Sequence, residues 1–264
     1  MRIVDAHCHL ACEEFEDTLE DVIEEARTAG VVKMVTSGVT PEDWDETRDM
    51  TRRFAEVEFA WGIHPWFVPL GEDGPAREEL DRAYARLRTA RDHGAVAVGE
   101  IGLDKRIDAP TMEDQVGVFE EQLAIADELG LPVVVHCRGA FNEVLHVLRA
   151  TRPLERGGLV HAFSGSLEVA EEFMRLGFSF SLGRSLTYRN SRKRETVLRK
   201  IYPDRFLLET DSPDMPPVEV KDGVNVPANI RFNLRAAAEI LGESEERVAE
   251  TTTANAARLF GLDV

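Results

Sequence analysis

The stretch VDAHCHL (residues 4–10) places two histidines, His7 and His9, directly after the apolar run near the start of the chain. Imidazole nitrogens are common ligands of divalent metal ions. Because side chains alternate along a β-strand, residues two apart face the same side. If the apolar run forms a strand, both imidazoles point into one space at its carboxyl end, and Cys8 points away. The pair therefore predicts half of a metal site.

Other imidazoles and carboxylates stand at the ends of later apolar runs. They are His64, Glu100, His136, His161 and Asp211. With the first pair they exceed the four ligands of one tetrahedral ion, so two divalent ions bridged by a carboxylate fit the set better. Glu100 is the expected bridge, because it is the acidic residue at the end of a central strand. Imidazole and carboxylate ligands suit Zn, Mn, Mg or Ni.

The elements that must position these residues are eight short runs rich in Val, Ile or Phe, a composition typical of strands. The runs cover residues 2–7, 31–38, 58–64, 95–102, 132–138, 158–163, 178–183 and 205–211. Amphipathic stretches between them are expected to be helices, and the last 40 residues are expected to form two closing helices. Eight strand–helix units predict an α/β fold, the (β/α)₈ TIM barrel, in one domain over residues 1–264.

In a TIM barrel the carboxyl ends of all eight strands meet at one mouth, where the active site forms. The candidate ligands all stand at such ends and are therefore expected to converge. An open doubly wound sheet is the alternative fold. Nucleotide-binding sheets of that kind carry a glycine-rich loop after the first strand, and His-Cys-His stands there instead.

The composition limits the partners and the compartment. The net charge of -18 argues against non-specific binding of long nucleic acid to the outer surface, because phosphates would be repelled. No apolar run approaches the roughly 20 residues of a membrane helix, and the start of the chain has too short an apolar stretch for a signal peptide. The three cysteines, an odd number, do not make a disulfide framework. We expect a cytoplasmic protein with no membrane association and no obligate protein partner.

Basic residues are concentrated in residues 184–200, which follow the seventh predicted strand on the side of the mouth. The segment holds seven basic residues and one acidic residue, a local charge of +6. Arg184, Arg189 and Arg192 either contact a polyanionic substrate or offset acidic neighbours, and the sequence leaves both readings open.

Four further side chains have two interpretations each. Arg138 shares the strand face of His136, where it either grips a phosphate bidentately or forms a surface ion pair. Glu209 shares the face of Asp211 one layer deeper, where it either supports a metal ligand or pairs with a buried cation. Trp61 and Trp66 flank His64 and either stack on a nucleobase or pack the barrel.

The sequence resembles the TatD family of metal-dependent deoxyribonucleases, within the amidohydrolase-like barrels. The matching motifs span nearly the whole chain in order: DAHCHL (5–10), GIHP (62–65), GEIGLD (99–104), VVVHCR (133–138), HAFSG (161–165), LLETDSP (207–213), NVPAN (225–229) and NAARLFGL (255–262). The resemblance implies a (β/α)₈ barrel with two divalent ions. It implies hydrolysis of phosphodiester bonds in DNA, often as a 3′-to-5′ exonuclease.

The resemblance also assigns roles to residues. One ion would be held by His7, His9, Glu100 and Asp211, and the other by Glu100, His136 and His161. His64 would face the substrate. Ala11 and Cys12 stand where the family usually has an acidic residue, and Lys105 stands where it often has an aromatic one. These departures touch none of the expected ligands, but they bear on how the substrate approaches.

We expect Asp211, Glu100 and His64 to be the catalytic residues, with His64 and Arg138 contacting the substrate, which is DNA or another phosphodiester. Asp211 would orient a metal-activated water and accept its proton. One rival function is an amidohydrolase that acts on C–N bonds, as a deaminase or a cyclic-amide hydrolase. Many dinuclear members of that group bridge the ions with a carboxylated lysine, where this sequence has Glu100. The other rival, a barrel retained only for binding, would be signalled by lost ligands, and all of them are present.

Overall fold

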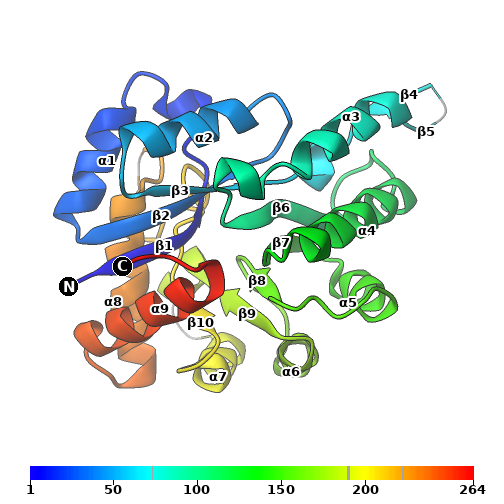
Figure 1. Ribbon diagram of the computed structural model, residues 1–264. Helices are drawn as coiled ribbons and strands as arrows, with labels where there is room; N and C mark the ends of the chain where they lie inside the picture. Colours follow the sequence, from blue (N-terminus) through cyan, green and yellow to red (C-terminus); the bar gives the residue numbers. More distant parts are fainter. Residues whose placement is uncertain (73, 189–190, 222) are drawn as a thin grey trace.

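A computed structural model describes residues 1–264 except 73, 189–190 and 222. In that described part of the chain, eight parallel strands form one sheet whose spatial order follows the sequence. The strands are β1 (Ile3–Cys8), β2 (Val31–Gly38), β3 (Val57–Trp61), β6 (Ala97–Asp104), β7 (Val133–Arg138), β8 (Gly158–Val160), β9 (Phe178–Ser181) and β10 (Phe206–Leu207). The sheet curls into a barrel (Figure 1). The predicted TIM barrel is confirmed.

Backbone hydrogen bonds join β1 to the chain that leaves β10, and they bring the two ends of the sheet together. The N–H of Ala6 donates to the carbonyl of Leu208 (2.9 Å), and the N–H of Asp211 donates to the carbonyl of His7 (3.0 Å). The N–H of His9 donates to the carbonyl of Ser212 (2.7 Å). This closure places Asp211, from the end of the barrel sequence, beside the histidines at its start.

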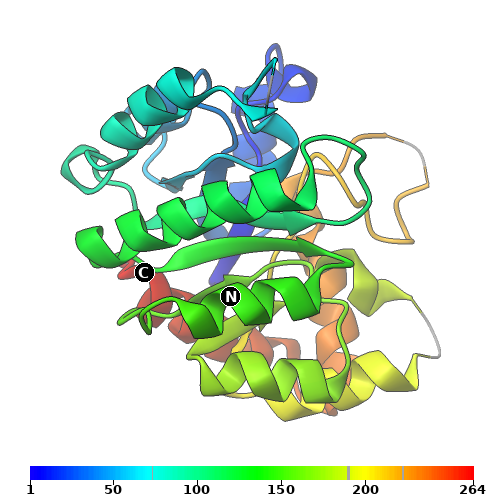
Figure 2. The same ribbon diagram turned by 90° about the vertical axis from the view of Figure 1, so that its right-hand side faces the viewer.

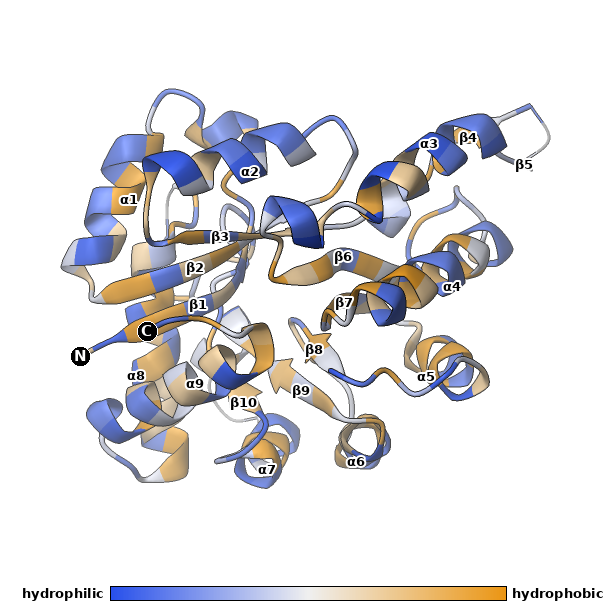
Figure 3. Cartoon of the chain, in the orientation of Figure 1, coloured by the Kyte–Doolittle hydropathy of each residue, from blue (hydrophilic) through white to orange (hydrophobic). Residues whose placement is uncertain are grey.

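Helices surround the strands, as the side view in Figure 2 shows. Their bounds are α1 Leu19–Thr28, α2 Trp44–Arg53, α3 Arg77–Leu87, α4 Met112–Leu129, α5 Phe141–Ala150, α6 Leu167–Arg175, α7 Arg192–Ile201, α8 Ile230–Leu241 and α9 Glu245–Phe260. Helices α8 and α9 are the two expected closing helices. Hydropathy colouring shows apolar strands and mixed helices with polar outer faces (Figure 3), the pattern of elements that bury one face. No helix of the described residues is long and apolar enough to cross a membrane.

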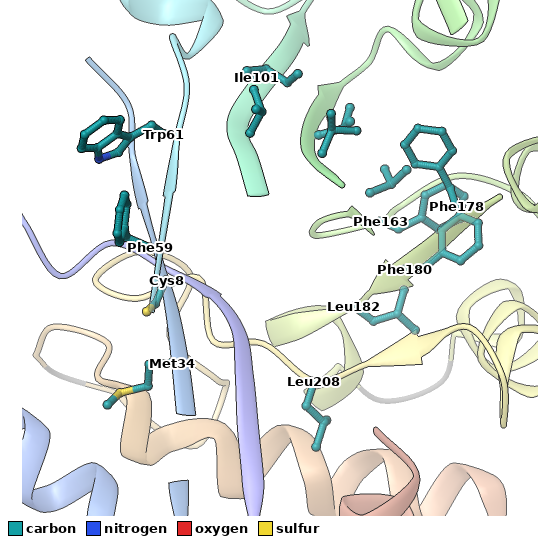
Figure 4. Close-up of a cluster of buried hydrophobic side chains, with 14 of the residues drawn as sticks. Cys8, Met34, Phe59, Trp61, Ile101, Phe163, Phe178, Phe180, Leu182 and Leu208 are labelled. Atoms are coloured by element: carbon teal, nitrogen blue, oxygen red, sulfur yellow. The ribbon is translucent and has the colours of Figure 1, made fainter. Parts of the chain in front are cut away.

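Large side chains fill the layer between the strands and the helices. Trp61, Phe59, Phe178 and Phe180 are among those drawn in Figure 4, and each is almost completely buried. The space inside the barrel takes mainly smaller residues, including Ala6, which pack with Leu259 and Phe260 of α9. Apolar packing thus closes the amino end of the barrel and leaves its carboxyl end to polar residues.

Strands β1 and β6 each carry one extra residue relative to the neighbouring strand. Asp5 pairs with Met34 and Cys8 with Thr36, so three steps on β1 match two on β2. Strand β6 shows the same mismatch between Val98 and Ile101. A bulge of this kind changes which face a side chain occupies, and bulges are common next to active sites. Here they lie beside His7 and Glu100.

The predicted strands at residues 58–64, 158–163, 178–183 and 205–211 extend further than the observed ones. The chain leaves regular pairing at Trp61, Val160, Ser181 and Leu207. His64, His161 and Asp211 therefore lie on irregular backbone beyond the strands. A further difference is the short antiparallel pair β4 (Leu70–Gly71) and β5 (Gly74–Pro75), whose strands are too short to leave a periodic signal.

Candidate metal centre

Glu100 stands among five imidazoles at the carboxyl end of the barrel. Its Oε2 lies 3.4 Å from Nε2 of His7 and 3.3 Å from Nε2 of His9. Its Oε1 faces the other three rings, at 3.4 Å from His64 Nε2, 2.9 Å from His136 Nδ1 and 2.7 Å from His161 Nε2. The two oxygens of the Glu100 carboxylate thus lie near different histidines.

Asp211 completes the group around Oε2. Its Oδ1 lies 3.4 Å from Nε2 of His7 and 3.7 Å from Nε2 of His9. Ligand atoms of His7, His9 and Asp211 lie within 4.8 Å of one another, as do those of His7, Glu100 and His161. The same holds for His64, Glu100 and His136. The structure therefore brings together all six expected ligands and His64.

Partners on the far side of the rings fix which nitrogen faces the centre. Ser37 contacts both rings of the first pair, with its Oγ 3.2 Å from Nδ1 of His7 and its carbonyl oxygen 3.2 Å from Nδ1 of His9. The backbone N–H of Trp66 donates to Nδ1 of His64 (3.2 Å). Each of these contacts leaves Nε2 directed at the carboxylates, the arrangement that orients metal-ligating histidines.

The donor set fits a divalent cation. Nε2 of His7 is completely buried, and no side chain or backbone group in the described residues makes a hydrogen bond to it. A buried nitrogen without a partner is costly unless something else satisfies it. The side chains of Glu100 and Asp211 are only 3% and 12% exposed, so their charges also need a compensating cation. Imidazoles with carboxylates would supply the ligands that Zn, Mn or Ni prefers.

The pKa values at the centre reflect the same charges. Burial disfavours the protonated ring of His7, but the nearby carboxylates, Glu100 first and then Asp211, raise its pKa well above the usual value. Burial also opposes protonation of His9, but Asp211 and Glu100 raise its pKa to about 9. Burial disfavours the charged form of Glu100, yet the surrounding imidazoles, His161 first, hold its pKa well below the usual value. Groups that stabilise positive charge on these rings would also stabilise a metal ion.

The backbone around Asp211 has an unusual conformation that neighbouring side chains hold in place. Asp211 has a φ of 59°, in the left-handed region that non-glycine residues seldom adopt. Asp5 accepts hydrogen bonds from the N–H and the hydroxyl of Thr210, at 2.9 and 2.5 Å. The side chain of Asn225 donates to the carbonyl of Thr210 (2.9 Å). Such conformations cluster at functional sites, where the surrounding structure maintains them.

Glu209 lies beside His161, one of the expected ligands, and makes no ion pair with an Arg or Lys of the described residues. Its Oε1 accepts from the N–H of Ala162 (2.8 Å), and its Oε2 accepts from the hydroxyl of Ser181 (2.5 Å). The Oε2 lies 3.8 Å from Nδ1 of His161. Burial, followed by repulsion from Asp211, raises the pKa of Glu209 to about 8. The carboxyl therefore ties the chain after β8 to β9, directly behind His161.

Asp104 is a residue that the sequence reasoning missed. It is completely buried at the end of β6, and its Oδ2 lies 3.2 Å from Nε2 of His136. The same oxygen accepts from the indole N–H of Trp66 (2.6 Å), and Oδ1 accepts from the N–H of Arg106 (2.7 Å). The signal was present, because Asp104 shares strand parity with Glu100 and closes the GEIGLD motif.

Of the side chains that the sequence placed around the mouth, Trp61 is buried, whereas Trp66 and Arg138 are exposed. Trp61 is fully buried and stacks on Trp44 at 5.3 Å between ring centroids, so its role is packing. Trp66 is 46% exposed beside His64. Arg138 is also exposed and makes a long ion pair with Asp104, with Nη1 3.9 Å from Oδ2, so both interpretations of this residue stay open.

The basic segment is only partly described. The guanidinium of Arg184 lies 5.3 Å from the ring centroid of Tyr188. Arg192 is exposed at the first residue of α7, and Arg189 lies outside the described residues. These positions leave both readings of the segment open.

Comparison with known proteins places the chain among relatives of similar length. Residues 4–261 match the model of the family described as TatD related DNase. The chain is 33% identical to the uncharacterized metal-dependent hydrolase YabD of Bacillus subtilis, over 99% of this chain and 100% of that protein. It is 32% identical to the human protein named deoxyribonuclease TATDN3, over 98% of this chain and 94% of that protein.

Solved structures agree with this placement. The crystal structure of YJJV, a TatD homologue from Escherichia coli, superposes with a TM-score of 0.88 at 32% identity and covers 99% of both chains. An organophosphorus hydrolase from Deinococcus radiodurans shares the barrel fold at a TM-score of 0.64 and 19% identity, covering 98% of this chain and 93% of its own. The chain belongs to the TatD family of metal-dependent hydrolases.

Proposed function

We propose that the protein hydrolyses phosphodiester bonds in DNA, as an exonuclease that acts from the 3′ end, with two divalent ions at the metal centre. The observation that carries the proposal is that the two oxygens of Glu100 face different histidines. Its Oε2 faces His7 and His9, and its Oε1 faces His64, His136 and His161, of which His161 also lies beside His7. A bridging carboxylate with ligands on both sides is the arrangement of a two-ion site. The DNase description of the family and the name of the human relative support DNA as the substrate.

Two ions bound there would lower the pKa of a water molecule and neutralise charge on the phosphate oxygens. Asp211 is the group that would orient this water and accept its proton. Burial raises the pKa of Asp211, but the neighbouring imidazoles of His7 and His9 more than offset this and hold the pKa below its usual range. The carboxylate is therefore ionised at neutral pH, as a group that holds an ion and orients a water must be.

His64 and Arg138 would contact the phosphate. Burial lowers the pKa of His64, so the ring is neutral near pH 7, with Nδ1 occupied by the N–H of Trp66. That contact leaves Nε2 directed into the site, 3.4 Å from Glu100, where it would face the charge that develops on the phosphate oxygens. Arg138 stands at the rim and has two parallel donors for a phosphate oxygen pair.

The test is a metal-reconstituted assay. The purified protein is stripped with a chelator, reloaded separately with Zn, Mn, Ni or Mg, and offered single-stranded DNA, duplex DNA, RNA and a chromogenic phosphodiester. We expect metal-dependent release of nucleotides from DNA ends. The same preparations are offered a panel of cyclic amides and nucleobases. Hydrolysis of that panel without activity on any phosphodiester would replace the proposal with the C–N hydrolase alternative.

A further inference from the structure

Trp66 is a large apolar side chain left in solvent beside the metal centre. Trp66 lies in the single turn of 3₁₀-helix at Pro65–Phe67, which begins directly after His64. The residue is 46% exposed. Its ring stands edge-on to His64, with centroids 5.0 Å apart and planes at 90°, and its centroid lies 6.1 Å from that of His136. The exposed part of the indole contributes no burial of apolar surface to the stability of the fold. Its position is therefore explained better by contact with a bound molecule.

The indole is held rigidly although its ring is exposed. Its N–H donates to Oδ2 of Asp104 at 2.6 Å, and its backbone N–H donates to Nδ1 of His64 at 3.2 Å. The hydrogen bond to the carboxylate at one end and the backbone bond at the other restrict the orientation of the ring.

We infer that Trp66 is a stacking platform for the nucleobase next to the phosphate that is cleaved, an inference that rests on the proposed function. Every base presents a flat face, and stacking on an aromatic side chain is largely independent of sequence. A ring fixed before binding loses little conformational entropy when a base stacks on it. Asp104 contacts both the Trp66 indole and His136, an expected ligand. One carboxylate therefore positions the stacking surface and a ligand of the metal centre.

The platform also defines the class of substrate. A base inside a duplex is already stacked on both faces and must leave the helix before it reaches an indole. The platform therefore selects single-stranded ends, or duplex ends that fray. Arg138, 3.9 Å from Asp104 Oδ2 and largely exposed, lies on the same side as a cation for the adjoining phosphate.

The experiment compares two oligonucleotides that differ only in the base of the terminal nucleotide, which is either natural or replaced by an abasic analogue. For the wild type, we expect KM to be about tenfold higher on the abasic end, since stacking contributes roughly 1–3 kcal/mol per base. In Trp66→Ala this ratio of KM values falls close to one. Trp66→Phe, which keeps a face but loses the indole N–H, gives an intermediate ratio. Leu70→Ala removes an equally exposed apolar side chain from the same connection and keeps the wild-type ratio.

A binding measurement supplies a second readout. In metal-loaded Asp211→Asn protein, single-stranded DNA should quench the fluorescence of Trp66, while Trp44 and Trp61 are buried and report little. Adding Trp66→Phe should remove the quenching. Equal ratios for the wild type and Trp66→Ala would overturn the platform while leaving the DNase proposal standing. Absence of any activity on DNA in the wild type would overturn both.

Discussion

Nε2 of His7 lies 3.4 Å from Oε2 of Glu100, although their strands, β1 and β6, are separated in the sheet by β2 and β3. Each strand carries an extra residue beside the side chain concerned, between Asp5 and Cys8 on β1 and between Val98 and Ile101 on β6. Both shifts of register thus lie next to side chains of the metal centre.

Replacing Asp211 with Asn should lower kcat by at least 100-fold, because the amide can neither accept the proton of the attacking water nor balance the charge of an ion. The strands should be unaffected, since the side chain lies at the mouth. The measurement is steady-state turnover with circular dichroism of the same preparations. Asp92→Asn, a neutral change at an exposed position, is the control. Wild-type turnover in folded Asp211→Asn protein, assayed at saturating metal, would refute the assignment.

Replacing Asp104 with Asn should weaken metal binding about 10- to 100-fold, the usual effect of removing a carboxylate that orients a ligating histidine. The amide has the same shape and still accepts from the Trp66 indole, but it loses the charge that faces Nε2 of His136. Competition with a chromogenic chelator measures the affinity. Unchanged affinity would show that His136 is oriented by Glu100 alone.

Metal removal should lower the thermal stability. A ligand at 100 times its Kd stabilises the folded state by about 2.7 kcal/mol, which for a chain of this size is a rise of several degrees in Tm. Chelated protein should therefore melt lower than protein reloaded with Zn, Mn or Ni. Differential scanning calorimetry on Glu100→Ala protein is the matched control, and its Tm should not respond to added metal. If none of the ions changes the Tm of the wild type, the proposal that these residues bind metal is contradicted.

The raised pKa of Asp43 should make the free energy of unfolding depend on pH. Burial raises its pKa to about 6, against hydrogen bonds from the N–H groups of Val39 and Thr40, while its ordinary value is 3.8. The folded state thus holds the proton more tightly than the unfolded chain. Stability from this group is fully present below about pH 4 and is lost as the pH rises through 6.

Asp43→Asn removes that titration and keeps an acceptor oxygen. The free energy of unfolding of the variant minus that of the wild type should therefore increase from pH 4 to 6 and level off above 7, as measured by urea denaturation at each pH. Other groups titrate equally in both proteins and cancel in the difference. A difference that stays constant with pH would mean that Asp43 is ionised throughout this range.

The sequence predicted the barrel because eight short runs rich in Val, Ile or Phe alternate with amphipathic stretches, a pattern that few folds accommodate. It predicted that the six ligands and His64 converge because the fold gathers strand ends at one mouth. Those seven side chains lie together in the structure, while their roles as ligands and catalysts remain proposals for the experiments above.

Other features of the metal centre could not be predicted from the amino-acid sequence. The bulges beside His7 and Glu100 follow from the pairing of one strand with its neighbour, which residue types do not encode. The left-handed backbone of Asp211 is a second such feature, because Asp5 and Asn225, which bond to the preceding Thr210, come from distant segments. Asp104 was overlooked for a different reason. Its strand parity was visible, but its partners come from distant segments, Trp66 from the turn at Pro65–Phe67 and His136 from β7.

The most direct test of two ions bridged by Glu100 is anomalous diffraction from crystals grown with Zn or Mn. The account predicts two anomalous peaks on either side of the Glu100 carboxylate, one beside His7, His9 and Asp211 and the other beside His136 and His161. Crystals of Glu100→Ala protein should show weaker peaks or none. A map without anomalous density at the mouth of the wild-type barrel, at saturating metal, would contradict the account.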